Sequence, residues 1–243
     1  MMCKDRVALV TGAAGKGMGR SIALTLAREG ASVVVNYRAS ADSATAIVEH
    51  VASRGGQAVA VQADVSTPDG CRALVEAATN AFGHVDICLV NPGAGWHPEP
   101  PEGLDAAAAL ADAQAELAPI YHLMPLVLPG MFERGWGRIV GVSLRRPFDS
   151  PSYAYNVAKA ARTHALLGMT RGAWKKGVTV NVIAPGPVEA VETLAGAVEL
   201  CDHGRAWTDR ANVMPQDIAE GVAFLCSEAG SFITGCELTY SFR

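Results

Sequence analysis

The chain of 243 residues lacks the features that mark membrane proteins and nucleic-acid-binding proteins. No apolar run approaches the ~18 residues that a membrane span needs, so we expect no membrane partner. The 24 acidic residues outnumber the 20 Lys and Arg residues, and no block of basic residues offsets that balance, which argues against a nucleic-acid partner. The N-terminus enters an apolar strand pattern almost at once instead of presenting a signal peptide, and this predicts a cytoplasmic protein.

Cysteine and histidine are also sparse, with six residues of each. The cysteines are scattered along the chain and none forms a CxxC pair, so we expect reduced, mostly buried thiols. The histidines show no metal-ligand spacing either, and the sequence predicts no bound metal.

Apolar residues, by contrast, are abundant, and at 50% of the chain they are sufficient to bury a large core. Short runs rich in Val, Ile and Ala alternate with helical patterns, and the runs are apolar throughout. Strands of this kind are typical of a parallel sheet that helices cover on both faces. We therefore predict a single α/β domain over residues 1–243, a three-layer, doubly wound Rossmann fold around seven parallel strands.

The expected elements follow from these patterns. Strands are expected at residues 7–10, 32–35, 58–62, 85–90, 138–142, 178–183 and 237–240. Helices are expected at residues 20–29, 41–54, 68–82, 105–134, 155–176 and 215–227.

The first expected strand leads into a glycine-rich turn at residues 11–19, TGAAGKGMG, and a helix follows. Glycine lets the backbone approach a pyrophosphate closely, and the helix N-terminus supplies free N–H groups and a positive dipole. The strand before and the helix after favour a dinucleotide-binding turn with contacts from Gly12, Gly17, Met18 and Gly19 over a purely structural turn.

The residues after the second strand, Asn36, Tyr37 and Arg38, bear on the choice of dinucleotide. Sites that prefer NAD usually place an acidic residue here for the ribose hydroxyls, whereas a cation suits a 2′-phosphate. This segment has no acid and one arginine, so it favours NADP(H), with NAD(H) possible. The alternative is that Arg38 is an ordinary solvated side chain.

Tyr155 and Lys159 stand four residues apart at the start of a helical pattern and so project from one face. A nearby ammonium favours the phenolate and lowers a pKa that starts near ~10. The pair therefore predicts that Tyr155 is a general acid or base near neutral pH.

With these motifs on one chain, the sequence resembles the short-chain dehydrogenase/reductase family over essentially its whole length. The further matching residues are Asp64, Val65, Asn91, Gly93, Asn181, Pro185, Gly186 and residues 232–235. Within the family, the chain is an atypical member that is most similar to 3-oxoacyl carrier-protein reductases and bacterial glucose dehydrogenases.

The resemblance implies that Tyr155 exchanges a proton with the substrate oxygen, while Lys159 steadies the nicotinamide ribose and lowers the pKa of Tyr155. It also implies cofactor contacts from the segments after the third, fourth and sixth strands. These contacts are Asp64, Val65, Asn91, Pro92, Gly93, Pro185, Gly186 and Val188. A loop at about 188–212, with Trp96 and His97, is expected to shape the pocket for a small carbonyl or alcohol substrate. Subunits are expected to pair through two long helices as a homotetramer or dimer, with a hetero-oligomer as an alternative.

The chain departs from the family pattern at several positions. The glycine turn is one residue longer than usual, and the fifth strand ends in Ser143 and Leu144, where the family places its catalytic serine second. Ser143 is our candidate for the catalytic hydroxyl, with Ser150 or Ser152 as weaker ones. The helix-borne asparagine of the family falls on Glu116, whose carboxylate could relay protons but would also titrate and repel an anionic substrate.

The function that these residues favour is NADP(H)-dependent interconversion of a ketone and a secondary alcohol by hydride transfer. The departures at Pro92, Glu116 and Leu144 motivate an alternative, a catalytically weak or silent subunit with a structural or regulatory role in a hetero-oligomer. Cofactor-independent lyase or dehalogenase chemistry is disfavoured, because relatives of that kind tend to lose the glycine turn and the lysine.

Overall fold

The computed structural model describes residues 1–145, 152–206, 208, 210 and 212–241. Seven parallel strands form one sheet in the order β3-β2-β1-β4-β5-β6-β7, as the doubly wound prediction requires. The strands are β1 (Val7–Val10), β2 (Ser32–Tyr37), β3 (Ala58–Gln62), β4 (Ile87–Val90), β5 (Gly137–Val142), β6 (Val178–Pro185) and β7 (Glu237–Tyr240).

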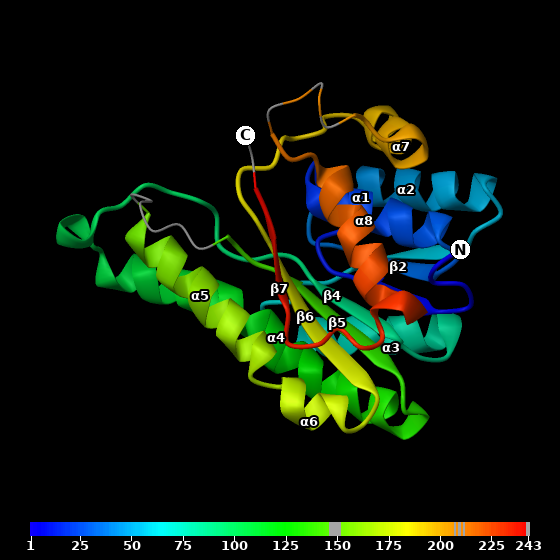
Figure 1. The fold of residues 1–243 in the computed structure, drawn as a ribbon, viewed down its shortest axis with the longest axis horizontal. Coiled ribbons are helices and arrows are strands. Elements are labelled where there is room, and N and C mark those ends of the chain that lie inside the picture. The colour runs from blue at the N-terminus through cyan, green and yellow to red at the C-terminus, as the bar shows by residue number, and fades with distance from the viewer. Residues whose placement is uncertain (146–151, 207, 209, 211, 242–243) are drawn as a thin grey trace.

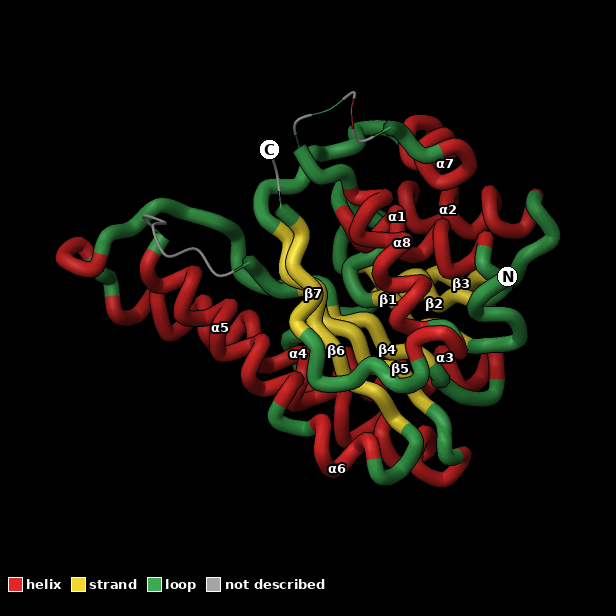
Figure 2. Tube along the Cα trace, viewed as in Figure 1, coloured by secondary structure: helices red, strands yellow, loops and turns green. Residues whose placement is uncertain are grey.

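Helices cover both faces of the sheet, so the molecule has three layers (Figures 1 and 2). One face carries α1 (Met18–Arg28), α2 (Ala41–Ser53), α7 (Leu194–His203) and α8 (Pro215–Cys226). The other face carries α3 (Pro68–Phe82), α4 (Ala106–Arg134) and α5 (Tyr153–Leu167), with the short α6 (Thr170–Trp174) after them. Each face of the sheet has its own apolar core, and β1 contributes side chains to both. Val10 packs into the core beneath α1, and Leu9 packs into the core beneath α4.

The structure corrects two expected elements. The helix expected at 155–176 is divided into α5 and α6, because the Met169 N–H donates to the carbonyl of Leu166, three residues earlier, instead of to the residue four earlier. The expected substrate loop at about 188–212 contains the whole of α7, which begins at a Thr193 cap.

Three prolines lie within α4, and none ends it. The helix runs from Ala106 to Arg134, and buried side chains such as Ile120, Leu123 and Val127 line its middle. Packing therefore outweighs the hydrogen bonds that Pro119 and Pro125 remove.

All six cysteines are free and five of them are buried, as the scattered spacing predicts. Within the described residues, the model contains no helix of the length and hydropathy that a membrane span requires. The same part of the chain brings no three His, Cys, Asp or Glu side chains into a metal-binding arrangement.

Candidate active site

The predicted site residues meet at the carboxyl ends of the strands. The order of the sheet reverses between β1 and β4, so the loops after these two strands diverge to opposite faces and leave a crevice. The glycine turn follows β1, and Asn91, Pro92 and Gly93 follow β4. This is the position at which ligands bind in doubly wound folds.

The glycines of the turn divide into packed and open positions. Gly12 has φ +61°, and a Cβ there would meet Cγ of Pro92 at 2.7 Å. A Cβ on Gly19 would clash with the carbonyl oxygen of Gly12, whereas Gly15 and Gly17 have no neighbour within 4 Å. The first pair lets the turn pack closely, and the second pair leaves open the space that a pyrophosphate needs beside the α1 N-terminus.

Two asparagines and a threonine hold the turn in shape. Thr11 Oγ1 donates to the Leu89 carbonyl at 2.8 Å and accepts from the Asn91 N–H at 3.0 Å. Asn36 is buried, and its side-chain oxygen accepts from the Gly12 N–H at 3.1 Å. Sequence reasoning noted Asn36 only as a position without an acid, and it missed this bond because the two residues are far apart in sequence.

Six of the predicted cofactor residues line one cavity of about 270 Å³ beside the turn. They are Gly12, Arg38, Asp64, Val65, Pro92 and Gly93. Asp64 accepts bonds from the Ser66 N–H and hydroxyl at 2.9 and 2.7 Å, which hold the pKa of its carboxyl below the usual value, and the nearby Arg38 charge adds to this effect. Arg38 itself is exposed at the cavity edge.

Tyr155 and Lys159 share one face of α5, with the Lys159 Nζ 5.4 Å from the centre of the Tyr155 ring. The expected lowering of the Tyr155 pKa is wrong. The pKa of Tyr155 is raised to about 12, with burial as the largest cause, the Glu116 carboxylate acting in the same direction and the Arg162 guanidinium opposing them. Burial also lowers the pKa of Lys159.

Glu116, on α4, is fully buried and binds the lysine directly. Its Oε1 lies 2.8 Å from Nζ of Lys159 and accepts from the Ala94 N–H at 2.7 Å, while its Oε2 lies 2.9 Å from Arg162. Arg162 is also fully buried, and it donates to the carbonyls of Val90 and Pro92, both at 2.6 Å.

Sequence reasoning identified Glu116 as a departure but missed Arg162. The signal was present, because Arg162 follows Lys159 by three residues and therefore shares its helix face. A second cation on that face, one turn from the predicted catalytic lysine, indicates a carboxylate partner.

Ser143 is buried at the end of β5, and its hydroxyl forms hydrogen bonds with two residues of α5. Oγ donates to the Lys159 carbonyl at 3.0 Å and accepts from Thr163 at 2.7 Å. The structure thus places the Ser143 hydroxyl against α5, at the backbone of the lysine. Of the weaker candidates, Ser152 is the buried N-cap of α5 and Ser150 lies outside the described residues.

The segment after β6 lies against the glycine turn. The Val191 N–H donates to the Lys16 carbonyl at 3.2 Å, and Lys16 Nζ forms an ion pair with Glu192 at 2.5 Å. Val188 pairs with Val213 across the loop, and Pro185 is the last residue of β6, with Gly186 directly after it.

Two aromatic residues of the loop after β4 were expected to shape the substrate pocket. His97 Nε2 lies 2.6 Å from the Asp112 carboxylate, one turn before Glu116 on α4, whereas Trp96 is largely exposed. The Tyr153 N–H donates to the Glu99 carbonyl, which joins this loop to the start of α5.

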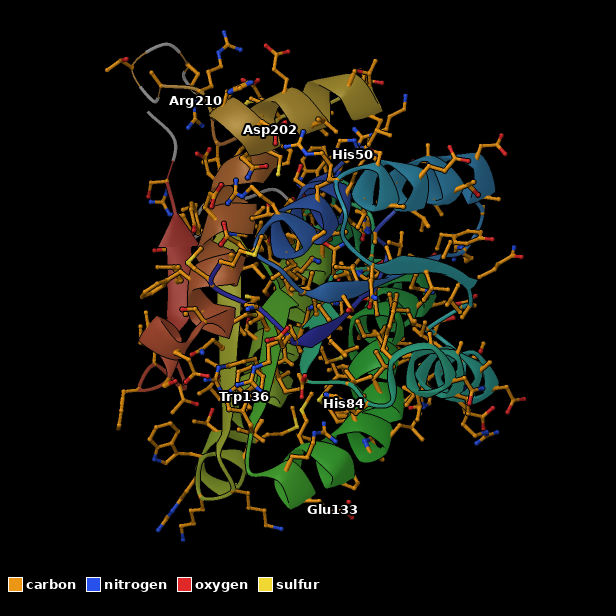
Figure 3. The ribbon with its side chains drawn as sticks, turned by 90° about the vertical axis from the view of Figure 1, so that its right-hand side faces the viewer. His50, His84, Glu133, Trp136, Asp202 and Arg210 are labelled. Atoms are coloured by element: carbon orange, nitrogen blue, oxygen red, sulfur yellow. The ribbon has the colours of Figure 1, made fainter. Side chains whose placement is uncertain are left out.

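A larger cavity, of about 550 Å³, lies at the amino ends of β2 and β3, away from all of these residues. Figure 3 labels two of its lining residues, Asp202 of α7 and His50 of α2, on helices that lie near each other. Its arginines are already paired, Arg28 with Glu220 and Arg54 with Asp202. None of the predicted site residues lines this cavity, whereas six of them line the smaller one.

Comparison with known proteins gives consistent matches over nearly the whole chain. Residues 12–241 match a family model described as Enoyl-(Acyl carrier protein) reductase. The 7alpha-hydroxysteroid dehydrogenase of Escherichia coli K12 is 34% identical over 97% of this chain and 92% of its own. The 3-oxoacyl-acyl-carrier-protein reductase FabG of Staphylococcus epidermidis is 32% identical over 95% of each chain.

Solved structures agree with the sequence matches. A 7 alpha-hydroxysteroid dehydrogenase complexed with NADH and 7-oxo glycochenodeoxycholic acid superposes with a TM-score of 0.85 and 32% identity, covering 99% of this chain and 94% of that one. A hydroxysteroid dehydrogenase from Escherichia coli gives a TM-score of 0.83 at 32% identity, covering 99% and 97% of the two chains.

Proposed function

The chain belongs to the short-chain dehydrogenase/reductase family, and on that premise we propose that it is an NADP(H)-dependent oxidoreductase that interconverts a ketone and a secondary alcohol. One arrangement supports this most strongly. Lys159, on the same helix face as Tyr155, binds Glu116. Glu116 in turn packs against Gly93, which lines the cavity of about 270 Å³ beside the glycine turn. The proton-transferring pair therefore lies next to the space that suits a cofactor. The names of the relatives, dehydrogenases and reductases, support the same reaction class.

The residues present fit a dinucleotide, since the open positions at Gly15 and Gly17 form a cradle that any Cβ would fill. In the proposal, the pyrophosphate would lie against the turn and the adenosine part in the cavity of about 270 Å³, near Arg38. The bound nucleotide supplies or accepts the hydride. The residues that would hold it are Gly12, Gly17, Met18, Gly19, Arg38, Asp64, Val65, Asn91, Pro92, Gly93, Tyr155, Lys159, Pro185, Gly186 and Val188.

Tyr155 and Lys159 have distinct tasks in this proposal. A phenol whose pKa is raised to about 12 is neutral at physiological pH, so Tyr155 is ready to donate its proton to a carbonyl oxygen. The Lys159 ammonium has three donors and directs one to Glu116, which leaves donors for the nicotinamide ribose. Ser143 supports this arrangement by holding the carbonyl of Lys159.

The reaction is tested with a panel of ketones and NADPH, comparing wild type with Tyr155→Phe. We expect turnover of at least one ketone and a loss of about 10²–10⁴-fold in kcat for the variant, because it retains the ring but cannot transfer a proton. Nucleotide binding without any Tyr155-dependent turnover would refute the oxidoreductase proposal and favour a silent subunit.

The cofactor preference is tested by fluorescence titration with NADPH and NADH. Arg38→Ala is expected to weaken NADPH binding by about 10- to 100-fold, because a hydrogen bond to a charged group contributes about 1.5–3 kcal/mol. NADH binding should change little, and Arg72→Ala, which removes an exposed arginine from α3, should affect neither. Equal losses of affinity for the two nucleotides would show that Arg38 does not bind the 2′-phosphate. NADH is included because one solved relative is complexed with it.

A further inference from the structure

The most unusual feature of the described chain is a buried cluster of charges formed by Glu116, Lys159 and Arg162. The side chains of Glu116 and Arg162 are fully buried, and that of Lys159 is 9% exposed. Both cations touch the same carboxylate, at 2.8 and 2.9 Å from its two oxygens. Charges this far from water persist only when partners and hydrogen bonds compensate them. Here the Glu116 carboxylate is shared by both cations, and the backbone carbonyls that Arg162 binds compensate the remainder.

The cluster rests directly against Tyr155, which shares a helix face with Lys159. An ammonium alone would favour the phenolate, as the sequence led us to expect. Here the Glu116 carboxylate approaches that ammonium to 2.8 Å and offsets its charge. Arg162 holds the Glu116 carboxylate in place, because the same guanidinium also donates hydrogen bonds to the carbonyls of Val90 and Pro92 at the end of β4.

We propose that Glu116, held by Arg162, is a positioning residue that offsets the Lys159 ammonium and keeps Tyr155 protonated through neutral and mildly alkaline solution, so that the enzyme acts there as a carbonyl reductase. Alcohol oxidation, which needs the phenolate as a base, then requires strongly alkaline solution. This inference deepens the proposed function and rests on it.

The charged groups around Tyr155 come from three elements. Glu116 and Asp112 face it from α4, and Lys159 and Arg162 lie with it on α5. The third element is the loop after β4, whose His97 pairs with Asp112. Burial is the largest cause of the raised pKa of Tyr155. Of the charges, both carboxylates raise this pKa and Arg162 lowers it, and Glu116 has the strongest effect of the three.

The geometry dictates which variants are informative. Glu116→Gln keeps the size of a side chain that packs against Gly93, but it leaves two buried cations without a counter-charge. The double variant Glu116→Gln with Arg162→Met removes one charge of each sign and leaves Lys159 as the only member of the cluster that carries a charge. Asp112→Asn is the matched control, because it removes a carboxylate from the same helix without touching Lys159.

The test reads the ionisation of Tyr155 in the protein without nucleotide. Phenolate absorbance is titrated with pH for wild type and each variant, and the curve of the matching Tyr155→Phe protein is subtracted. We expect the midpoint to fall by about one pH unit or more in Glu116→Gln. It should fall by less in the double variant, which also loses the Arg162 charge that lowers the pKa of Tyr155, and by less in Asp112→Asn. The pH profile of kcat for alcohol oxidation should move by the same amount, which a merely structural role would not produce.

The outcomes separate the two proposals. If Tyr155 titrates at the same pH in wild type and in Glu116→Gln, or moves as far with Asp112→Asn, Glu116 has no special role and the inference fails. If the midpoints move as expected but no protein turns over any ketone, the proposed function fails and the positioning role of Glu116 stands. Should Glu116→Gln not fold, the double variant still decides the question.

Discussion

Ser143 is the residue at which an expected catalytic role and a structural role can be told apart. Its hydroxyl donates to the Lys159 carbonyl and accepts from Thr163, so it connects the end of β5 to the turn of α5 that carries the lysine. Leu144, which follows, is half-buried and has no hydroxyl to offer. Ser143, which aligns only approximately with the family serine, thus has a structural role in joining β5 to α5.

We expect Ser143→Ala to lower the free energy of unfolding by about 1–3 kcal/mol, because it leaves partly buried polar groups without a partner. Its effect on kcat should be small beside that of Tyr155→Phe. Urea unfolding and steady-state kinetics measure the two effects, and Thr163→Val, which removes only one bond of Ser143, should show a smaller loss of stability. A fall of 10²–10³-fold in kcat with unchanged stability would instead identify Ser143 as a donor to the reacting oxygen.

At the scale of elements, α7 is the helix that the sequence did not reveal. Its residues read as a loop because they follow a Pro-Gly turn and show only a short apolar pattern over Leu194–His203. Contacts from distant helices hold it in place. Arg54 at the end of α2 binds Asp202 with two bonds, at 3.0 and 2.8 Å, and Arg28 of α1 donates to the Cys201 carbonyl at 2.5 Å.

Arg28 connects three helices, since it also binds Glu220 of α8 through two bonds at 2.9 and 2.8 Å. We expect Arg28→Ala to reduce stability by about 1–2 kcal/mol, allowing for the half-exposed Glu220, and to speed amide hydrogen exchange in α7. Because the bonds from Arg28 hold the pKa of Glu220 below its usual value, their contribution is present at neutral pH and is lost as the pH falls through that lowered value.

The difference in stability between wild type and Arg28→Ala should therefore be full at pH 7 and should shrink in acid. Urea unfolding at several pH values checks this, and Arg72→Ala, which breaks an exposed pair within α3, should show almost no difference at any pH. A difference that persists unchanged into acid would show that Arg28 acts through packing alone.

For the whole molecule, the sequence predicts the sheet, its helices and the dinucleotide cavity because these depend on local patterns. Apolar runs define strands, and glycines define the turn that contains Gly12. Gly93 is assigned to the same site through the family resemblance, and both residues line one cavity. The pairing of Glu116 with Arg162 could not be predicted in the same way. It depends on how α4 packs against α5, and the pKa of Tyr155 depends in turn on that pairing.

The assembly of subunits is the remaining question at this scale. Helices α4 and α5 lie side by side at one edge of the molecule (Figure 1). Four large apolar side chains of this pair are exposed to solvent: Leu110 and Tyr121 on α4, and Tyr153 and Val157 on α5. Exposed apolar side chains gathered on adjacent helices favour an interface, and a second copy of the chain presents the same surface, as a two-fold dimer requires.

We therefore expect the protein to be a homo-oligomer in solution and Val157→Arg to dissociate it. Val157 is 52% exposed, so an arginine there is tolerated in a folded subunit but introduces facing charges across a two-fold axis. Light scattering after size exclusion should give at most half the wild-type mass, with circular dichroism unchanged. Met2→Arg changes another exposed apolar residue, far from α4 and α5 in sequence, and should leave the mass unaltered. A wild-type mass of one subunit, or a Val157→Arg mass equal to wild type, would show that α4 and α5 do not form the interface.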